Sequence, residues 1–150
     1  MKTILTFTKS GFFKIVFSLL FLCSCRAKEL ARPDESVKDL TGSWKIVKAV
    51  QNGKDITGRF NFASFRINFL DNKKYEIQNQ LPFIVKKNGA FDLDDPQYPF
   101  SIKFNEEGSS TAVSSNFNYP ITNGARLLNL SFSPGCVGNS YIYTLQKVHP

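Results

Sequence analysis

Apolar and polar residues alternate with a period of two through most of the chain after residue 41, a pattern typical of half-buried β-strands. The clearest example is a hairpin of residues 64–69 and 74–78 joined by a turn at 71–73. The same alternation predicts further strands at 43–50, 90–93, 100–104, 111–114, 128–132 and 141–146. Roughly eight short strands, with no amphipathic helix longer than a turn or two, predict an all-β fold.

The predicted architecture is an eight-stranded up-and-down antiparallel barrel. Nearly every strand has one apolar face, and closing the sheet into a barrel removes its exposed edges. Segment 81–85 is apolar but contains Pro82, which makes it an edge or crossing segment. Residues 116–125 and 133–139 are predicted as loops, and 116–125 is the longest connection.

The chain before the strands has the features of an export signal. Three lysines precede an apolar run at 15–22, which is too short for a membrane span of about 20 residues. A buried N-terminal helix is the alternative interpretation. The run ends in Leu22-Cys23-Ser24-Cys25, which resembles the bacterial lipobox. That resemblance implies cleavage after Ser24 and lipidation of Cys25.

The expected organisation is therefore a signal peptide at 1–24, a flexible polar tether at 25–37 and a barrel domain at 38–148. Two or more acyl chains on Cys25 suffice for stable anchoring. The expected location is the cell envelope, most simply the outer membrane, with its periplasmic and external faces both left open. The expected membrane contact is this N-terminal lipid anchor.

Charge and cysteine content change this picture little. The chain has 19 Lys and Arg against 12 Asp and Glu, a net charge of +7. Removing the three lysines of the signal leaves 16 against 12, or +4, which suits solubility and does not indicate nucleic-acid binding. With Cys23 removed and Cys25 lipidated, Cys136 has no disulfide partner, so stability must come from a hydrophobic core.

The start of the first strand, Gly42-Ser43-Trp44, resembles the Gly-x-Trp motif of the lipocalin and calycin group. The order of lipobox, short tether, barrel and final Tyr-x-Tyr-x-Leu strand is similar to small lipocalin-like lipoproteins of unknown function. The resemblance implies that Trp44 closes one end of the barrel and packs against a basic residue of the last strand, here Lys147. We expect the Lys147 ammonium within about 6 Å of the Trp44 ring, or else as a solvated terminal lysine.

Residues that could carry catalysis are few. His149 stands next to the C-terminus, and Cys136 has no second histidine to activate it. The acids at 92, 94 and 95 lack the glycine and distal glutamate of a calcium loop, so a solvated turn is the simpler interpretation. We expect no enzymatic activity, no cofactor and no metal.

The remaining candidates are aromatic side chains on the inward faces of the strands. They either line a pocket or fill a solid core, because eight strands enclose a space just wide enough for side chains. The residues are Phe65, Phe69, Tyr75, Phe91, Phe100, Phe104, Phe132, Tyr141 and Tyr143.

These alternatives give two functional hypotheses. The first is a binding module for a small apolar or amphipathic ligand, held at the barrel mouth opposite Trp44. The second is a scaffold with a filled barrel that contacts protein or glycan partners through the loops at 116–125 and 133–139. A lumen of about 300 Å³ or more favours the ligand, and a packed interior favours the scaffold.

Overall fold

The computed structural model describes residues 34–135 and 138–149. The predicted signal peptide, Cys25, the tether up to residue 33 and Cys136 lie outside these ranges. The described chain forms ten strands and one short 3-10 helix, η2 (Phe62–Ser64). The strands are β1 (Gly42–Gln51), β2 (Lys54–Asp55), β3 (Arg66–Phe69), β4 (Lys74–Gln78), β5 (Gly89–Leu93), β6 (Ser101–Glu106), β7 (Val113–Asn118), β8 (Ile121–Thr122), β9 (Ala125–Phe132) and β10 (Tyr141–Lys147).

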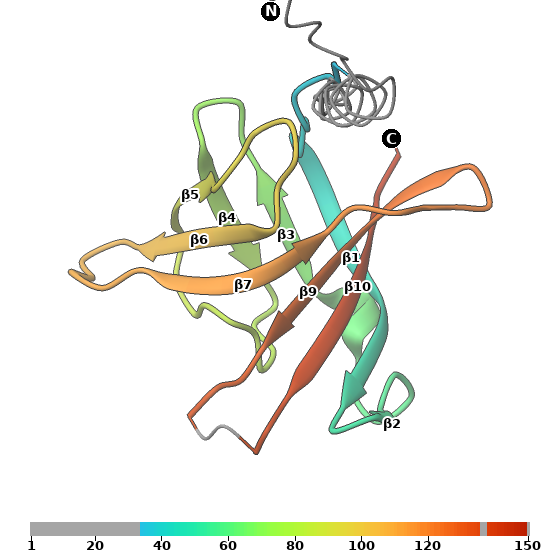
Figure 1. Ribbon diagram of the computed structural model, residues 1–150. Coiled ribbons are helices and arrows are strands. Elements are labelled where there is room, and N and C mark those ends of the chain that lie inside the picture. Colours follow the sequence, from blue (N-terminus) through green and yellow to red (C-terminus); the bar gives the residue numbers. More distant parts are fainter. Residues whose placement is uncertain (1–33, 136–137, 150) are drawn as a thin grey trace, which may run out of the picture. The chain divides into compact units, whose positions relative to one another are not determined.

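Eight of these strands close into an antiparallel barrel in the order β1, β3, β4, β5, β6, β7, β9, β10 (Figure 1). Closure is made by β10, which pairs with β9 on one side and with β1 on the other. The two shortest strands lie outside the ring: β2 pairs with β1, and β8 pairs with the start of β9 in a hairpin drawn in orange. The prediction of an all-β, eight-stranded up-and-down barrel is confirmed.

A β-bulge in β1 sets which of its side chains enter the barrel. Trp44 and Ile46 point inward, but the register with β10 shifts between Ile46 and Lys48. The extra residue, Val47, is 37% exposed, whereas Ala49 is fully buried. The inward positions therefore change from even to odd numbers along one strand, and the added twist helps the strand curve around the barrel.

Gly89 is required where β5 leaves β4 and joins β6. It pairs with Tyr75 on one side and Glu106 on the other. A Cβ atom at this position would overlap the carbonyl oxygen of Asn105. Only glycine therefore allows the three backbones to approach so closely.

The structure corrects the prediction for residues 111–125. A strand was expected at 111–114, but β7 runs over Val113–Asn118 and buries Ser115 and Phe117. The expected long connection contains β8 and a turn in which Asn123 and Gly124 both have positive φ, the form that suits a tight hairpin. The serine and asparagine residues of β7 hid its alternation, because they are uncommon in strands.

The barrel core is continuous from one end to the other. Twenty hydrophobic side chains are no more than 6% exposed and form a single cluster. Two of them, Phe83 and Val85, come from the segment between β4 and β5, which has no strand structure. Residues 81–85 are therefore a crossing segment, one of the two forms predicted for them, and the side chains of Phe83 and Val85 enter the barrel interior.

Candidate functional site

The barrel mouth opposite Trp44 is filled by the chain itself. Phe83 lies among aromatic rings of the surrounding strands, with centroid distances of 4.9 Å to Phe65, 5.8 Å to Phe132 and 6.1 Å to Tyr143. Further edge-to-face contacts join Tyr75 to Phe104 and Phe132 to Tyr143. Such pairs stabilise a core by roughly 0.5–1.5 kcal/mol each beyond the burial of their area. The mouth is a packed core rather than an open chamber.

Two tyrosine hydroxyls lie in this interior and differ in their partners. Tyr143 donates a hydrogen bond to the carbonyl oxygen of Pro82 at 2.6 Å, which ties the crossing segment to β10. The hydroxyl of Tyr75 has no hydrogen-bond partner among the described residues. Burial raises the pKa of both hydroxyls above the usual value of 10.0, with nearby Glu106 and Glu107 adding to the effect at Tyr75. Neither group is therefore a base near neutral pH.

Most of the aromatic residues predicted to face inward do so. Six of them are buried in the core: Phe65, Phe69, Tyr75, Phe104, Phe132 and Tyr143. Phe91 and Tyr141 are half-buried and pack against it, Phe91 at 4.7 Å from Phe69 and Tyr141 stacked 5.6 Å from Phe132. Whether any of them contacts a ligand stays a prediction.

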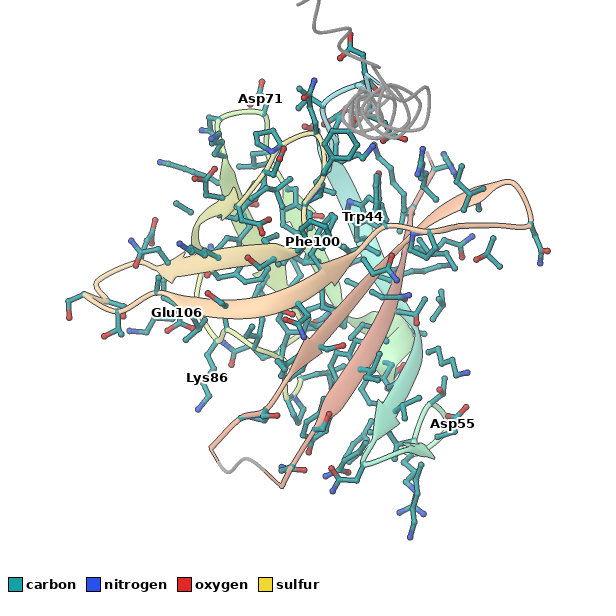
Figure 2. All side chains as sticks on the ribbon, in the orientation of Figure 1. Trp44, Asp55, Asp71, Lys86, Phe100 and Glu106 are labelled. Carbon is teal, nitrogen blue, oxygen red and sulfur yellow. The ribbon has the colours of Figure 1, made fainter. Side chains whose placement is uncertain are left out.

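Phe100 is the exception, and the prediction that it faces inward is wrong. Its side chain is 76% exposed, and β6 begins one residue later (Figure 2). The Asp94 carboxylate accepts backbone N–H groups of both Phe100 and Ser101 at 3.0 Å. These bonds hold the chain in a turn before the strand begins, so the alternation seen in Ile102 and Phe104 does not extend back to Phe100.

The other end of the barrel is closed around Trp44. Its ring is fully buried, and its Nε1–H donates to the carbonyl oxygen of Leu40 at 2.8 Å. Trp44 and Lys147 are direct partners across β1 and β10, which confirms their predicted proximity. The lysine side chain lies over Gly42, where any Cβ would meet its Cε.

The predicted cation–π contact between Lys147 and Trp44 is not found in the described part of the chain. The cation–π contact at this end joins Arg126 to Tyr119 instead, with the guanidinium carbon 5.2 Å from the ring centroid. Tyr119 in turn lies 6.0 Å from the Trp44 ring. The space left by Gly42 accommodates the lysine stem, and Tyr119 supplies the aromatic cover of Trp44.

Residues 35–41, here called the strap, cross this closed end before β1 begins. The Lys38 N–H donates to the carbonyl oxygen of Pro96 at 2.8 Å, and the Tyr119 hydroxyl donates to that of Asp39 at 3.2 Å. The Glu35 N–H donates to the Tyr98 hydroxyl at 3.3 Å. The strap is thus attached to the β5–β6 loop and to the end of β7.

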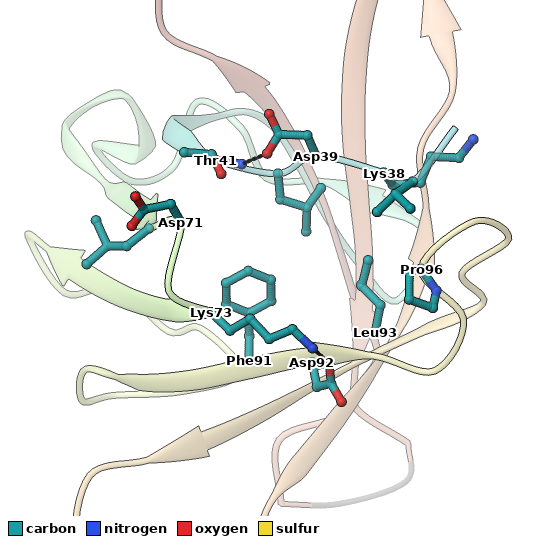
Figure 3. A pocket seen from close by; sticks show the side chains of 12 residues that line it. Lys38, Asp39, Thr41, Asp71, Lys73, Phe91, Asp92, Leu93 and Pro96 are labelled. Carbon is teal, nitrogen blue, oxygen red and sulfur yellow. Dashed lines mark hydrogen bonds and ion pairs between the residues drawn. The ribbon is translucent and has the colours of Figure 1, made fainter. Parts of the chain in front are cut away.

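Two hollows flank the bridge between Lys38 and Pro96, and Lys38 lines both. The first has a volume of about 230 Å³ and an apolar lining that includes Leu40, Phe91 and Leu93 (Figure 3). Its charged rim includes Lys73, whose ammonium lies 2.8 Å from the Asp92 carboxylate. The hydrogen bond and charge of Lys73 lower the pKa of Asp92. Lys73 and Asp92 are therefore paired with each other on this rim.

The second hollow has a volume of about 310 Å³ and is dominated by aromatic and proline rings. Phe117 is its most buried member, while Phe100 is its most exposed aromatic ring. Its charged residues are Glu35, Lys38 and Arg126. A third hollow, of about 320 Å³ and lined by Ile84, Val113 and Phe132, lies beside the filled mouth.

The acidic residues beside the second hollow organise the loop through hydrogen bonds to its backbone. Asp94 accepts three backbone N–H groups and Asp95 accepts those of Gln97 and Tyr98. These backbone bonds lower the pKa of Asp94. Residues 34–135 and 138–149 contain no cluster of His, Cys, Asp and Glu suited to a metal ion. His149 is exposed.

Sequence reasoning missed the second hollow because its parts are far apart in the chain. The hollow is formed by segments that meet only in the folded barrel: strap residues 35 and 38, loop residues 97–100, and positions 117, 119 and 126. The one local signal was the Tyr98-Pro99-Phe100 triplet directly after an aspartate turn, a cluster of rings where loops are usually polar.

The filled interior and closed sheet define an eight-stranded antiparallel β-barrel domain whose accessible hollows lie on its outside. Residues 24–146 match the family described as Domain of unknown function (DUF5004), and the chain belongs to this family. Neither a curated protein nor a solved structure matches the chain significantly. Among the described residues, no helix is both long and apolar enough to cross a membrane.

Proposed function

We propose that this protein is a lipid-anchored component of the cell envelope that binds a partner through the second hollow, with its filled barrel as a rigid scaffold. The observation that carries this proposal is the occupation of the barrel mouth by Phe83 and Val85, which are 4% and 2% exposed and pack among the aromatic rings of the core. The outer surface offers the second hollow instead, where Phe100 is 76% exposed among other rings. Large exposed aromatic side chains are typical of binding surfaces.

The lipid anchor on Cys25 is part of the proposal and is supported by the lipobox-like Leu22-Cys23-Ser24-Cys25. The family match begins at Ser24, one residue before the proposed first mature residue. Mass spectrometry of the protein purified from its own envelope should show a chain that begins at acylated Cys25. A Cys25→Ser variant should lose the acyl mass, and an unmodified Met1 in the wild type would disprove the anchor.

Site-specific photocrosslinking in the native envelope tests the binding surface. A benzoylphenylalanine residue at position 100 should crosslink a partner, whereas the same residue at position 60 should not. Phe60 is the matched control because it is also an exposed phenylalanine, at 52%, but lies in the β2–β3 connection. Equal crosslinking at the two positions, or none at position 100, would contradict the proposal.

Native mass spectrometry addresses the competing hypothesis of a small ligand in the lumen. The proposal predicts that protein extracted from its envelope carries no additional small molecule once lipid on Cys25 is accounted for. A retained apolar molecule that is lost in a Phe83→Trp variant would place a ligand in the mouth and would refute the scaffold role.

A further inference from the structure

The second hollow holds an arginine in a fixed position beside exposed aromatic rings. Arg126 donates from its Nη1 to the carbonyl oxygen of Tyr119 at 3.1 Å and lies over the ring of the same residue. The Tyr119 hydroxyl is itself bonded to the strap at Asp39. Both ends of this aromatic support are therefore fixed, and the guanidinium loses little further freedom when it binds a ligand.

Arg126 has no ion-pair partner among the described residues. The two ion pairs found among the described residues join Lys38 to Glu35 and Lys73 to Asp92, and neither involves Arg126. The nearby Asp94 carboxylate accepts backbone N–H groups. Without the three lysines of the proposed signal the chain has 16 Lys and Arg against 12 Asp and Glu, a net charge of +4, so an anionic group is the complementary partner for this site.

The shape of the guanidinium narrows the chemistry further. Only Nη1 is used in the bond to Tyr119, so the remaining N–H groups can face solvent. Arginine binds carboxylates through two parallel hydrogen bonds, a geometry that an ammonium cannot reproduce. The adjoining ring of Phe100 offers apolar contact within the same 310 Å³ hollow.

We infer that the second hollow binds a polypeptide segment in which a carboxylate side chain stands next to an apolar one. Arg126 would receive the carboxylate, and the Phe100 and Tyr119 rings would receive the apolar side chain. A polypeptide is favoured over a glycan because tyrosine, phenylalanine and arginine are the residues enriched where proteins bind each other. This inference rests on the proposed function of the same hollow.

The test uses the full chain in detergent micelles and a random eight-residue peptide library displayed on phage. Peptides selected on the wild type should share an Asp or Glu beside an apolar residue. The tightest one is then compared with its Asn or Gln counterpart by fluorescence anisotropy. We expect the counterpart to bind about tenfold more weakly or worse, as the loss of a charge-assisted hydrogen-bond pair implies.

Three arginine variants distinguish the effect of the Arg126 charge from that of its hydrogen-bonding geometry and from the effect of removing a positive charge elsewhere on the surface. Arg126→Gln should weaken peptide binding by about tenfold or more, and Arg126→Lys should lose part of the affinity because it keeps the charge but not the two-pronged geometry. Arg59→Gln, which removes the same charge from an exposed position in the β2–β3 connection, should bind like the wild type. Circular dichroism confirms that each variant is folded.

The outcomes distinguish this inference from the proposed function. If Phe100→Ser abolishes binding of the selected peptide while Arg126→Gln does not, the hollow binds a partner but the carboxylate inference is overturned. If neither change matters, both proposals fail. If no peptide is selected, or if an oligogalacturonate binds in an Arg126-dependent manner more tightly than any selected peptide, the polypeptide assignment is overturned.

Discussion

Replacing Phe83 by alanine should destabilise the barrel more than any surface substitution, because Phe83 fills the mouth. The side chain is 4% exposed and its ring contacts Phe65, Phe104, Phe132 and Tyr143. Truncating a buried phenylalanine costs about 3–5 kcal/mol in lost transfer free energy and in the cavity left behind. The four ring contacts place the expected loss of unfolding free energy toward the upper part of that range.

The assay is urea unfolding of the wild type and of Phe83→Ala, followed by tryptophan fluorescence of the buried Trp44. The midpoint should fall while the slope with denaturant stays nearly constant, which shows that stability and not compactness has changed. Phe100→Ala is the matched control, since removing a ring that is 76% exposed should change stability by no more than about 0.5 kcal/mol. A loss below about 1 kcal/mol for Phe83→Ala would refute the packed mouth, because that is less than the cost of a single buried cavity.

Three further predictions concern the same interior. Tyr143→Phe should lower the free energy of unfolding by about 1 kcal/mol, because it removes the hydrogen bond to Pro82. Tyr75→Phe should leave the free energy of unfolding unchanged, since the Tyr75 hydroxyl has no partner among the described residues. Urea unfolding measures both effects. Burial raises the pKa of both tyrosines, so the free energy of unfolding should fall as pH rises above about 10. Each tyrosine should contribute a fall of about 1.4 kcal/mol per pH unit. The Tyr75→Phe variant, which keeps only one of the two hydroxyls, should lose stability less steeply with pH. Gly89→Ala should lower the free energy of unfolding by at least about 2 kcal/mol, because the added Cβ would overlap the β6 backbone. A Cβ at position 58 would have no neighbouring atom within 4 Å, so Gly58→Ala is the control and should unfold at the same temperature as the wild type.

The sign of the alkaline effect follows from which state holds the proton. In the folded barrel the buried tyrosines stay protonated above pH 10, whereas in the unfolded chain they ionise near their usual pKa of 10.0. The unfolded state then binds fewer protons than the native state, and rising pH favours unfolding. A stability that is constant from pH 9 to pH 11 would contradict the buried position of these hydroxyls.

The strands and their closure could be predicted from the sequence because alternation reports directly on which residues are buried. The hairpin of β3 and β4 was found from its pattern and turn, and the meeting of β1 and β10 followed from the resemblance of Gly42-Ser43-Trp44 to a known motif. In both cases the signal lies within a few neighbouring residues. The structure confirms that Trp44 lies opposite Lys147 and adds the shift in register between Ile46 and Lys48.

The contents of the mouth and the outer hollow could not be predicted, because both depend on contacts between distant segments. Nothing in the residues around Phe83 shows that a loop side chain will occupy the barrel interior. At Phe100, alternation gave the wrong face because the Asp94 carboxylate holds the preceding turn and delays the start of β6. Patterns of period two assign faces within a strand, but they do not locate the residue at which the strand begins.

The filled core and the proposed binding surface share one residue, Phe117. Its side chain is 6% exposed, belongs to the core cluster and also lines the second hollow. Its N–H donates to the carbonyl oxygen of Phe100 at 2.8 Å, and its ring contacts Tyr119 at 5.8 Å. The exposed aromatic rings of the hollow are thus held by a residue that the packed interior fixes in place. A solid barrel therefore serves the proposed binding role directly, because a rigid support reduces the entropy lost when Phe100 and Arg126 engage a partner.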